Sequence, residues 1–116
     1  MSASSRSHTV ATVLSLTLCE QQAYVANRVV LFRDTAWPSI PPEGALLAFG
    51  VYGEGEDKGE YAGITARIQR VFFDARGSVH VEASMENLRD EYDHIVALAK
   101  NDGFMEYAEW RDRRGD

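Results

Sequence analysis

The sequence predicts an α+β fold: a small, mainly antiparallel, partly closed β-barrel with two or three short helices. Between residues 9 and 83, segments in which apolar and polar residues alternate recur, as in strands that have one covered face. Turns and loops join these segments, and the clearest helical spacing of apolar residues lies near the C-terminal end. Connections of this kind favour an antiparallel, partly closed sheet over a parallel one.

Length and composition are those of one ordinary domain. The chain has 116 residues, of which 45% are hydrophobic and 26% charged. A domain of this length buries roughly two thirds of the surface that its unfolded chain exposes, so we expect no structural metal, cofactor or disulfide. Residues 1–7 are small and polar and are expected to form a disordered leader before a single domain over residues 8–116. The chain lacks an apolar run of the ~18 residues that span a membrane, and its single cysteine, Cys19, agrees with a reducing compartment, so we expect a cytoplasmic protein.

The N-terminal part predicts two strands with a helix between them. Alternating leucines indicate a strand over residues 9–18. Residues 20–27 fit a short helix or a strand, and their Gln-Gln-Ala run leads us to favour the helix. A strand over residues 28–33 follows. Three prolines then exclude a central strand or helix and predict a rigid crossing loop over residues 34–44, which contains Trp37.

The middle of the chain predicts three further strands. Residues 45–52 are mostly apolar and indicate a strand that is covered on both faces. Residues 53–59 combine glycines with charged residues and predict a long exposed loop. Residues 61–73 alternate again and indicate a long strand. The Asp-Ala-Arg-Gly sequence at 74–77 predicts a tight turn, after which alternation from Val79 onward completes a hairpin.

The C-terminal part predicts two helices. Helical spacing of apolar residues begins at Leu88, and either Ser84 or Asn87 can cap the N-terminus of this helix. Lys100 in its last turn and Gly103 beyond its end suit a helix C-terminus. A second short helix is expected from about residue 105 to residue 113. The apolar residues that could hold it to the sheet are Phe104, Ala108 and Trp110.

Charge is distributed unevenly along the chain. The net charge of −6 disfavours general binding to a phosphate backbone. Residues 53–60 and 82–93 together carry −7, so the remainder of the chain carries +1. The two acidic windows either keep the domain soluble or attract a basic protein surface, as in an inhibitor or adaptor of the phage or immunity type. The residues assigned to this alternative are Glu54, Glu56, Asp57, Glu60, Glu86 and Asp90.

The sequence contains no motif that predicts catalysis or metal binding. Its three histidines lie in separate segments far from Cys19 and lack the spacing of a zinc site. Glu86, Asp90 and His94 recur every four residues, which could give an acid–base cluster or a solvated face on one helix. Because no nucleophile accompanies them, we leave enzymatic activity open and favour a non-enzymatic role.

The order of elements in the second half carries a family resemblance. A strand with the sequence Ala-Gly-Ile-Thr-Ala-Arg-Ile-Gln-Arg-Val at 62–71 leads to an acidic helix that ends in Asp-Gly-Phe at 102–104. A final short helix with an aromatic residue, Trp110, follows. Residues 44–110 thereby resemble the ASCH domain, a small barrel similar to PUA domains. The resemblance implies RNA recognition or an amidohydrolase activity.

We therefore expect a small non-enzymatic binding domain that recognises RNA or a nucleotide-like ligand in a cleft of a PUA-like barrel. The family's ligand-side signature, a glycine and a lysine followed by a Thr-x-Arg-like segment, should fall near residues 26–33. The chain lacks it there, and only Asn27-Arg28 and Arg33 remain of it. Trp37 follows an arginine and can stack on a base or pack beneath its own loop. The acidic protein-binding module is the second hypothesis, and an ASCH-type amidohydrolase is the third. The expected ligand-binding residues are Arg33, Trp37, Tyr61 and Arg67.

Overall fold

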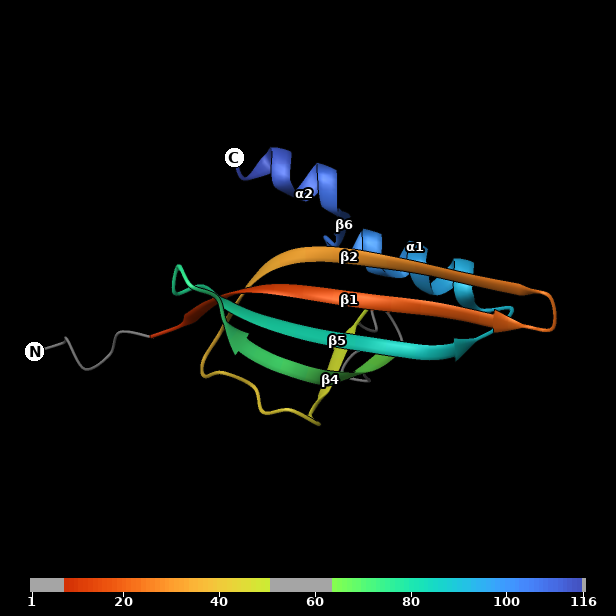
Figure 1. Cartoon of the computed structure of the whole chain (residues 1–116), viewed down its shortest axis with the longest axis horizontal. Coiled ribbons are helices and arrows are strands. Elements are labelled where there is room, and N and C mark those ends of the chain that lie inside the picture. Colours follow the sequence, from red (N-terminus) through yellow and green to blue (C-terminus); the bar gives the residue numbers. More distant parts are fainter. Residues whose placement is uncertain (1–7, 51–63, 116) are drawn as a thin grey trace, which may run out of the picture.

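A computed structural model describes residues 8–50 and 64–115 of the chain. Its strands are β1 (Val10–Gln22), β2 (Val25–Trp37), β3 (Leu46–Phe49), β4 (Ile64–Phe73), β5 (Val79–Leu88) and β6 (Met105–Glu106), and its helices are α1 (Tyr92–Asn101) and α2 (Tyr107–Arg113). The strands form one sheet in the order β3–β4–β5–β1–β2–β6, in which only the β1–β5 pair is parallel (Figure 1). The predicted α+β class and mainly antiparallel sheet are confirmed. The expected leader lies outside the described residues.

The first hairpin is longer than the sequence indicated. β1 and β2 pair along all 13 residues of each strand. The helix favoured for residues 20–27 is therefore wrong, because these residues complete β1, form a two-residue turn and begin β2. Their polar side chains bond across the pair, since Asn27 Nδ2 donates to Glu20 Oε1 over 2.7 Å. β2 continues as far as Trp37, which ends a strand instead of lying in the proline-rich loop.

The second hairpin, between β4 and β5, confirms the prediction for the turn at residues 74–77. The Asp74 carboxylate accepts hydrogen bonds from the amides of Arg76 and Ser78 at 2.8 and 3.0 Å. Gly77 adopts a φ of 89°, which an L side chain would strain. The turn is thus fixed by one acidic side chain and one glycine.

β5 extends into the region where the sequence predicted a helix. It pairs in parallel with β1 as far as the position where Leu88 lies beside Glu20. Asn87 adopts a φ of 60° near the end of this strand, and α1 begins only at Tyr92. The expected capping by Ser84 or Asn87 is therefore wrong. Pairing with a distant strand outweighed the local helical spacing in this segment.

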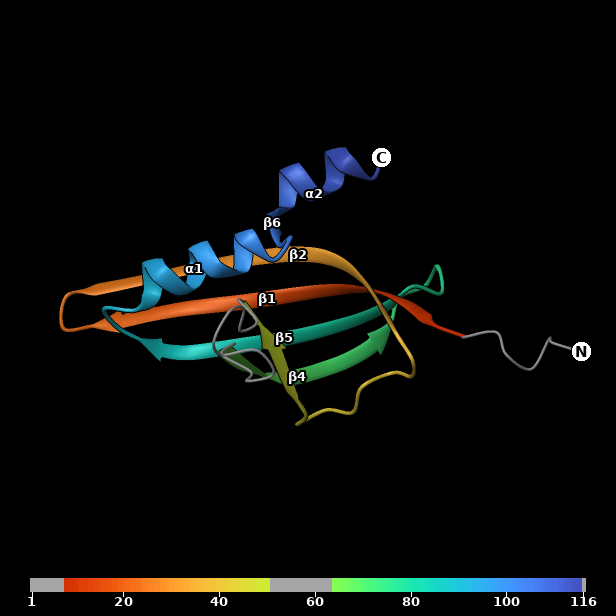
Figure 2. The same ribbon diagram turned by 180° about the vertical axis from the view of Figure 1, so that it is seen from behind.

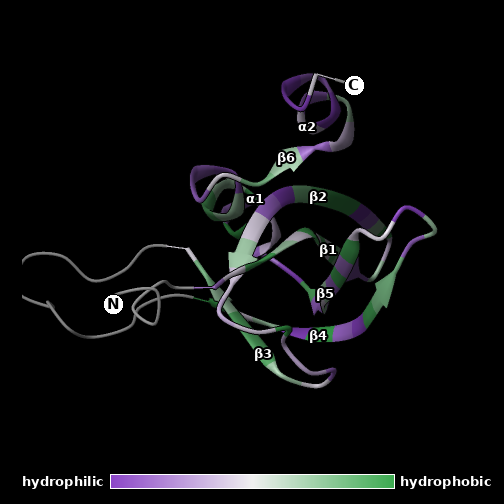
Figure 3. Cartoon of the chain, turned by 90° about the vertical axis from the view of Figure 1, so that its left-hand side faces the viewer, coloured by the Kyte–Doolittle hydropathy of each residue, from purple (hydrophilic) through white to green (hydrophobic). Residues whose placement is uncertain are grey.

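One face of the sheet, the inner face, carries the apolar core and is covered by α1 (Figure 2). Figure 3 shows the alternation of hydrophilic and hydrophobic residues as bands along the strands. The core includes Leu14, Leu16, Leu18, Leu31, Ile68, Val81, Ala83, Tyr92, Ile95, Ala99 and Phe104. Burying each large side chain contributes roughly 1.5–3 kcal/mol, so this face supplies most of the driving force for folding.

The two edges of the sheet approach each other around Asp102, just beyond the end of α1. Its carboxylate accepts the N–H of Gly50, which follows β3, at 3.2 Å and pairs with Arg33 of β2 at 3.8 Å. The rings of Phe49 and Phe104 meet at a centroid distance of 6.0 Å. Over residues 8–50 and 64–115 no strand pairing joins these edges, so the sheet is open and the expected partial closure of a barrel is not observed there.

The two short elements at the edges differ in how well they match the predictions. β3 is buried on one side only, with Leu47 inside and Leu46 exposed, so the expectation of two covered faces is wrong. α2 agrees with the second predicted helix, and Phe104 and Trp110 are buried as expected, whereas Ala108 is exposed. The loop expected at residues 53–59 lies outside the described residues. In the described part of the chain, neither helix is long and apolar enough to cross a membrane.

The opposite face of the sheet, the outer face, is defined by residues that alternate with the core. They are Ser15, Thr17, Phe32, Asp34, His80 and Glu82. α2 packs against part of this face, whereas α1 covers the inner face, so the chain passes around the β2 edge through β6 (Figure 3). The two helices therefore lie on different sides of the sheet, and the outer face stays more polar.

Candidate functional site

Two residues of the predicted cleft, Arg33 and Trp37, have structural roles at separate places on the inner face. The guanidinium of Arg33 pairs with Asp102 and lies 5.8 Å from the ring centroid of Phe104. Trp37 packs against the core, and its Nε1 donates to Thr12 Oγ1 over 2.6 Å. Each of these side chains is thus engaged within the protein.

Arg67 does not join them. It is exposed on β4, where its Nη1 donates to the backbone oxygen of Gly44 at 2.8 Å. Alternation along the strands places Arg67 on the outer face and Arg33 on the inner face, and β5 and β1 separate their strands. The structure therefore does not bring the two arginines together in one cleft. Tyr61 lies outside the described residues.

Only two of the six residues assigned to the acidic protein-binding hypothesis lie in the described part of the chain. Glu86 and Asp90 are both exposed, the first within β5 and the second in the connection to α1. His94 lies on α1, so the expectation that these three residues share one helical face is wrong. The other members of the proposed acidic surface, Glu54, Glu56, Asp57 and Glu60, lie outside the described residues.

A different group of side chains converges beneath α2. The ring of Trp110 stacks on Phe32 of β2 with a centroid distance of 5.3 Å and an interplanar angle of 25°. Tyr107 meets the same Phe32 ring edge-on at 5.4 Å. On the sheet side, Asp34 Oδ1 accepts the indole N–H of Trp110 at 3.1 Å. These contacts hold α2 on the outer face of β2 and create one wall of a groove.

The groove lies between α2 and the 74–77 turn, with Val13 of β1 at its floor, and has a volume of about 390 Å³. Three of its lining side chains are arginines, Arg76, Arg111 and Arg114, whereas Asp74 is its one carboxylate. We call this site the arginine groove. Its lining has an excess of positive charge, although the chain has a net charge of −6.

The carboxylate in the groove is already satisfied by the protein. Asp74 accepts the amides of Arg76 and Ser78, and its Oδ2 lies 2.8 Å from His80 Nε2. The hydrogen bond from His80 lowers the pKa of Asp74, and the two backbone amides act in the same direction. Phe72 stacks on His80 at a centroid distance of 4.9 Å, which fixes the imidazole in the opposite wall. Asp74 therefore orders this wall of the groove.

The arginines are held less tightly. Arg114 lies over the Trp110 ring at 4.6 Å, and its Nε is 3.9 Å from Asp34 Oδ2. Arg111 Nη2 lies 3.6 Å from the carboxylate of Asp112. Long, exposed ion pairs of this kind contribute little free energy, so an incoming anion can replace them. Within the described residues, the guanidinium of Arg76 has no ion-pair partner.

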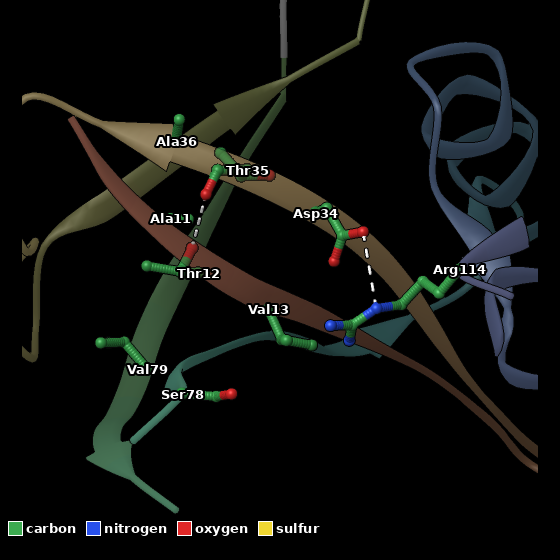
Figure 4. A pocket seen from close by; sticks show the side chains of 9 residues that line it. All are labelled: Ala11, Thr12, Val13, Asp34, Thr35, Ala36, Ser78, Val79 and Arg114. Atoms are coloured by element: carbon green, nitrogen blue, oxygen red, sulfur yellow. Dashed lines mark hydrogen bonds and ion pairs between the residues drawn. The ribbon is translucent and has the colours of Figure 1, made fainter. Parts of the chain in front are cut away.

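A second hollow of about 410 Å³, the side pocket, adjoins the groove, and Figure 4 draws its nine lining residues. The two hollows share Val13, Ser78 and Arg114. Figure 4 shows the Arg114 side chain reaching from α2 toward the space between Asp34 and Val13. The rest of the side pocket is half apolar and half polar, and its lining residues are Ala11, Ala36 and Val79 beside Thr12, Asp34 and Thr35.

Sequence reasoning did not find the arginine groove. The Arg-Asp-Arg-Arg sequence at 111–114 could have indicated a basic site, because it concentrates positive charge in a chain whose net charge is −6. Arg76 and His80, however, come from a hairpin that is distant in sequence. Only the packing of α2 on the outer face brings the two basic segments together.

Comparisons of the chain with protein-family models, with curated proteins and with solved structures found no match. In the described ranges, no cluster of three or more histidine, cysteine or acidic side chains could hold a metal ion. A functional assignment therefore has to come from the geometry and charge of the groove itself.

Proposed function

We propose that the protein is a small non-enzymatic binding domain that recognises a phosphate-bearing ligand, RNA or a nucleotide-like molecule, in the arginine groove. The observation that carries this proposal is the meeting of Arg76, Arg111 and Arg114 around one groove on a chain that is acidic overall. Guanidinium groups match the geometry of phosphate oxygens and can donate two parallel hydrogen bonds to them. The ligand class is the one expected from the sequence, but the proposed site is different.

The aromatic side chains of the groove support the nucleotide part of the proposal. Trp110 and Tyr107 line the groove from α2, and His80 lines it from β5. Trp110 is buried between Phe32 and Arg114, and His80 is stacked on Phe72, so the exposed Tyr107 is the ring that can contact a base or sugar. A simple inorganic anion would leave the Tyr107 ring unused, whereas a nucleotide would contact both the arginines and this ring.

The resemblance to ASCH and PUA-like domains points to the same ligand class. We also propose that the whole domain has the PUA-like barrel architecture of that family. Arg76 belongs to the 74–77 turn, Arg111 belongs to α2, and Arg114 directly follows α2. A site of this construction depends on the folded sheet, so an unfolded or truncated chain should not retain it. We also infer a cytoplasmic location, where nucleotides and RNA are abundant.

The test is binding of AMP and of a short single-stranded RNA to the full chain, measured by calorimetry and by fluorescence anisotropy. Arg111→Gln should weaken binding of both probes about tenfold, because it removes a charge-assisted contact to phosphate. Arg113→Gln is the matched control: it lies on the same helix and removes the same charge. Arg113 lines a different hollow and pairs with Glu109, so this variant should bind like the wild type.

Two results would overturn the proposal. One is that neither probe binds at low salt, where attraction to the arginines is strongest. The other is that Arg111→Gln and Arg113→Gln weaken binding equally, which would indicate a diffuse effect of charge. Circular dichroism of both variants confirms that the fold is kept.

A second candidate function is the acidic protein-binding module. Glu86, Asp90, Glu91 and Asp93 are all exposed near the junction of β5 and α1, and Asp90, Glu91 and Asp93 lie close together in sequence. Such a cluster steers a basic partner toward this end of the sheet. A pull-down with a basic protein surface that is lost in Glu86→Lys with Asp90→Lys, but kept in Arg111→Gln, would favour this candidate over the first.

A further inference from the structure

The arginine groove and the side pocket adjoin each other. They share Val13, Ser78 and Arg114, and their volumes are about 390 and 410 Å³. Sites for small ligands usually measure 300–1,000 Å³. A single small molecule could therefore occupy both compartments, with Arg114 at their boundary.

The two compartments differ in chemistry. The groove is lined by three guanidinium groups, whereas the side pocket has only that of Arg114 and is lined beside it by small side chains, among them Ala11, Ala36 and Thr35. Asp34 adds a carboxylate to the lining of the side pocket, and its side chain is 56% exposed. A carboxylate has several acceptor positions, so Asp34 can receive an amino or ring N–H group while it still holds Trp110. The side pocket thus suits a flat heterocycle that carries N–H donors.

The surroundings of the groove disfavour a long polyanion. Beyond His80, the outer face of β5 continues with Glu82 and Glu86, which line a neighbouring hollow. Successive phosphates of an RNA strand that ran along the sheet would meet these carboxylates. Binding of a polynucleotide usually requires a cationic track that follows the backbone. Here the three arginines are gathered at one point instead.

We propose that the two compartments bind one nucleoside 5′-monophosphate, with the phosphate against Arg76, Arg111 and Arg114 and the base in the side pocket. This inference rests on the proposed function and narrows its ligand to a mononucleotide. It assigns separate roles to the compartments: the groove supplies charge, and the side pocket recognises the base.

The test is calorimetry of the full chain with inorganic phosphate, ribose 5-phosphate, the four common ribonucleoside monophosphates and a short single-stranded RNA. Phosphate and ribose 5-phosphate should bind weakly through the arginines. At least one mononucleotide should bind about tenfold more tightly than ribose 5-phosphate, because its base buries apolar surface in the side pocket. The RNA should gain nothing over the best mononucleotide.

A variant that blocks the side pocket distinguishes the contributions of the two compartments to binding. Ala36→Phe fills the side pocket and should remove the gain from the base while ribose 5-phosphate still binds. Ala26→Phe is the matched control, because Ala26 is also exposed and lies on the same strand and face near the far end of the first hairpin. This control should bind mononucleotides like the wild type.

The outcomes distinguish the two proposals. If ribose 5-phosphate and every mononucleotide bind equally in an Arg111-dependent manner, the base-binding inference is wrong and the proposed function stands. An RNA that binds much more tightly than any mononucleotide would also overturn the inference, in favour of a strand-binding groove. If no phosphate compound binds, both proposals fail together.

Discussion

The indole N–H of Trp110 donates a hydrogen bond to Oδ1 of Asp34 over 3.1 Å. This contact joins α2, near the C-terminal end of the chain, to the outer face of β2. The other oxygen of the same carboxylate lies 3.9 Å from Arg114 Nε. One aspartate therefore positions both an aromatic ring and a cation of the arginine groove.

Replacing Asp34 should loosen α2. We expect Asp34→Ala to lower the free energy of unfolding by about 1 kcal/mol, because it leaves the buried indole N–H of Trp110 without its acceptor. Asp34→Asn keeps an acceptor oxygen and should lose less. Urea unfolding curves measure the difference. Equal losses in the two variants would show that the hydrogen bond has no separate role.

The leucines of β1 should dominate stability. Leu16 is completely buried between the sheet and α1, so Leu16→Ala should cost about 2–5 kcal/mol through lost burial and a cavity. Leu46→Ala is the control, because Leu46 is 59% exposed on β3 and should cost less than about 0.5 kcal/mol. Thermal and urea unfolding of both variants test this ranking. Similar losses at the two positions would contradict the described core.

Replacing Thr35 should stabilise the protein, unlike the two substitutions above. Among the described residues, its hydroxyl is the one buried side-chain polar group without a hydrogen-bond partner. Thr35→Val removes this hydroxyl with little change in shape, so it should raise the free energy of unfolding by about 1 kcal/mol. Urea unfolding of this variant beside the wild type measures the change. A destabilised Thr35→Val would mean that the hydroxyl is satisfied in solution.

The Asp74–His80 pair should make stability depend on pH in the acid range. The hydrogen bond from His80 lowers the pKa of Asp74 in the folded protein. The ionised carboxylate therefore stabilises the fold above its unfolded pKa of about 4, and this contribution is lost as the pH falls through the lower, folded pKa. We expect Asp74→Asn to flatten the loss of stability below about pH 4. Parallel pH profiles for the variant and the wild type would rule out this contribution.

Turns and helix ends could be predicted where neighbouring residues alone determine the backbone. The β4–β5 hairpin could be predicted because the Asp-Ala-Arg-Gly turn contains both the carboxylate that accepts backbone amides and the glycine with a positive φ. The end of α1 could also be predicted, since Gly103 adopts a φ of 93° just after the helix. In both places a single residue type fits the required backbone.

The first hairpin could not be recognised from its turn. Its two-residue loop, Ala23 and Tyr24, contains no glycine or asparagine, and neither residue has a positive φ. Two-residue hairpins usually carry those residues, so the sequence lacked the expected signal. The Gln-Gln-Ala run then favoured a helix, and only pairing along all of β2 shows that these residues form a strand.

The groove depended on contacts between distant segments. β1 and β5 pair in parallel, and this arrangement places His80 of β5 on the same face as Asp34 of β2. The separation of Arg33 and Arg67 has the same cause: strand alternation, once the pairing is known, assigns them to opposite faces. Charge and aromatic content led to the proposed ligand chemistry but did not indicate this position in the fold.

The chain's two tryptophans allow the most direct test of the central claim, that the ligand binds beneath α2. Trp110 lines the arginine groove, whereas Trp37 is bonded to Thr12 at the end of β2. In a ¹⁵N-labelled sample titrated with AMP, we expect the indole N–H signal of Trp110 to shift progressively while that of Trp37 stays in place. A shift of the Trp37 signal with an unmoved Trp110 signal would contradict the account and place the ligand near the end of β2, away from α2.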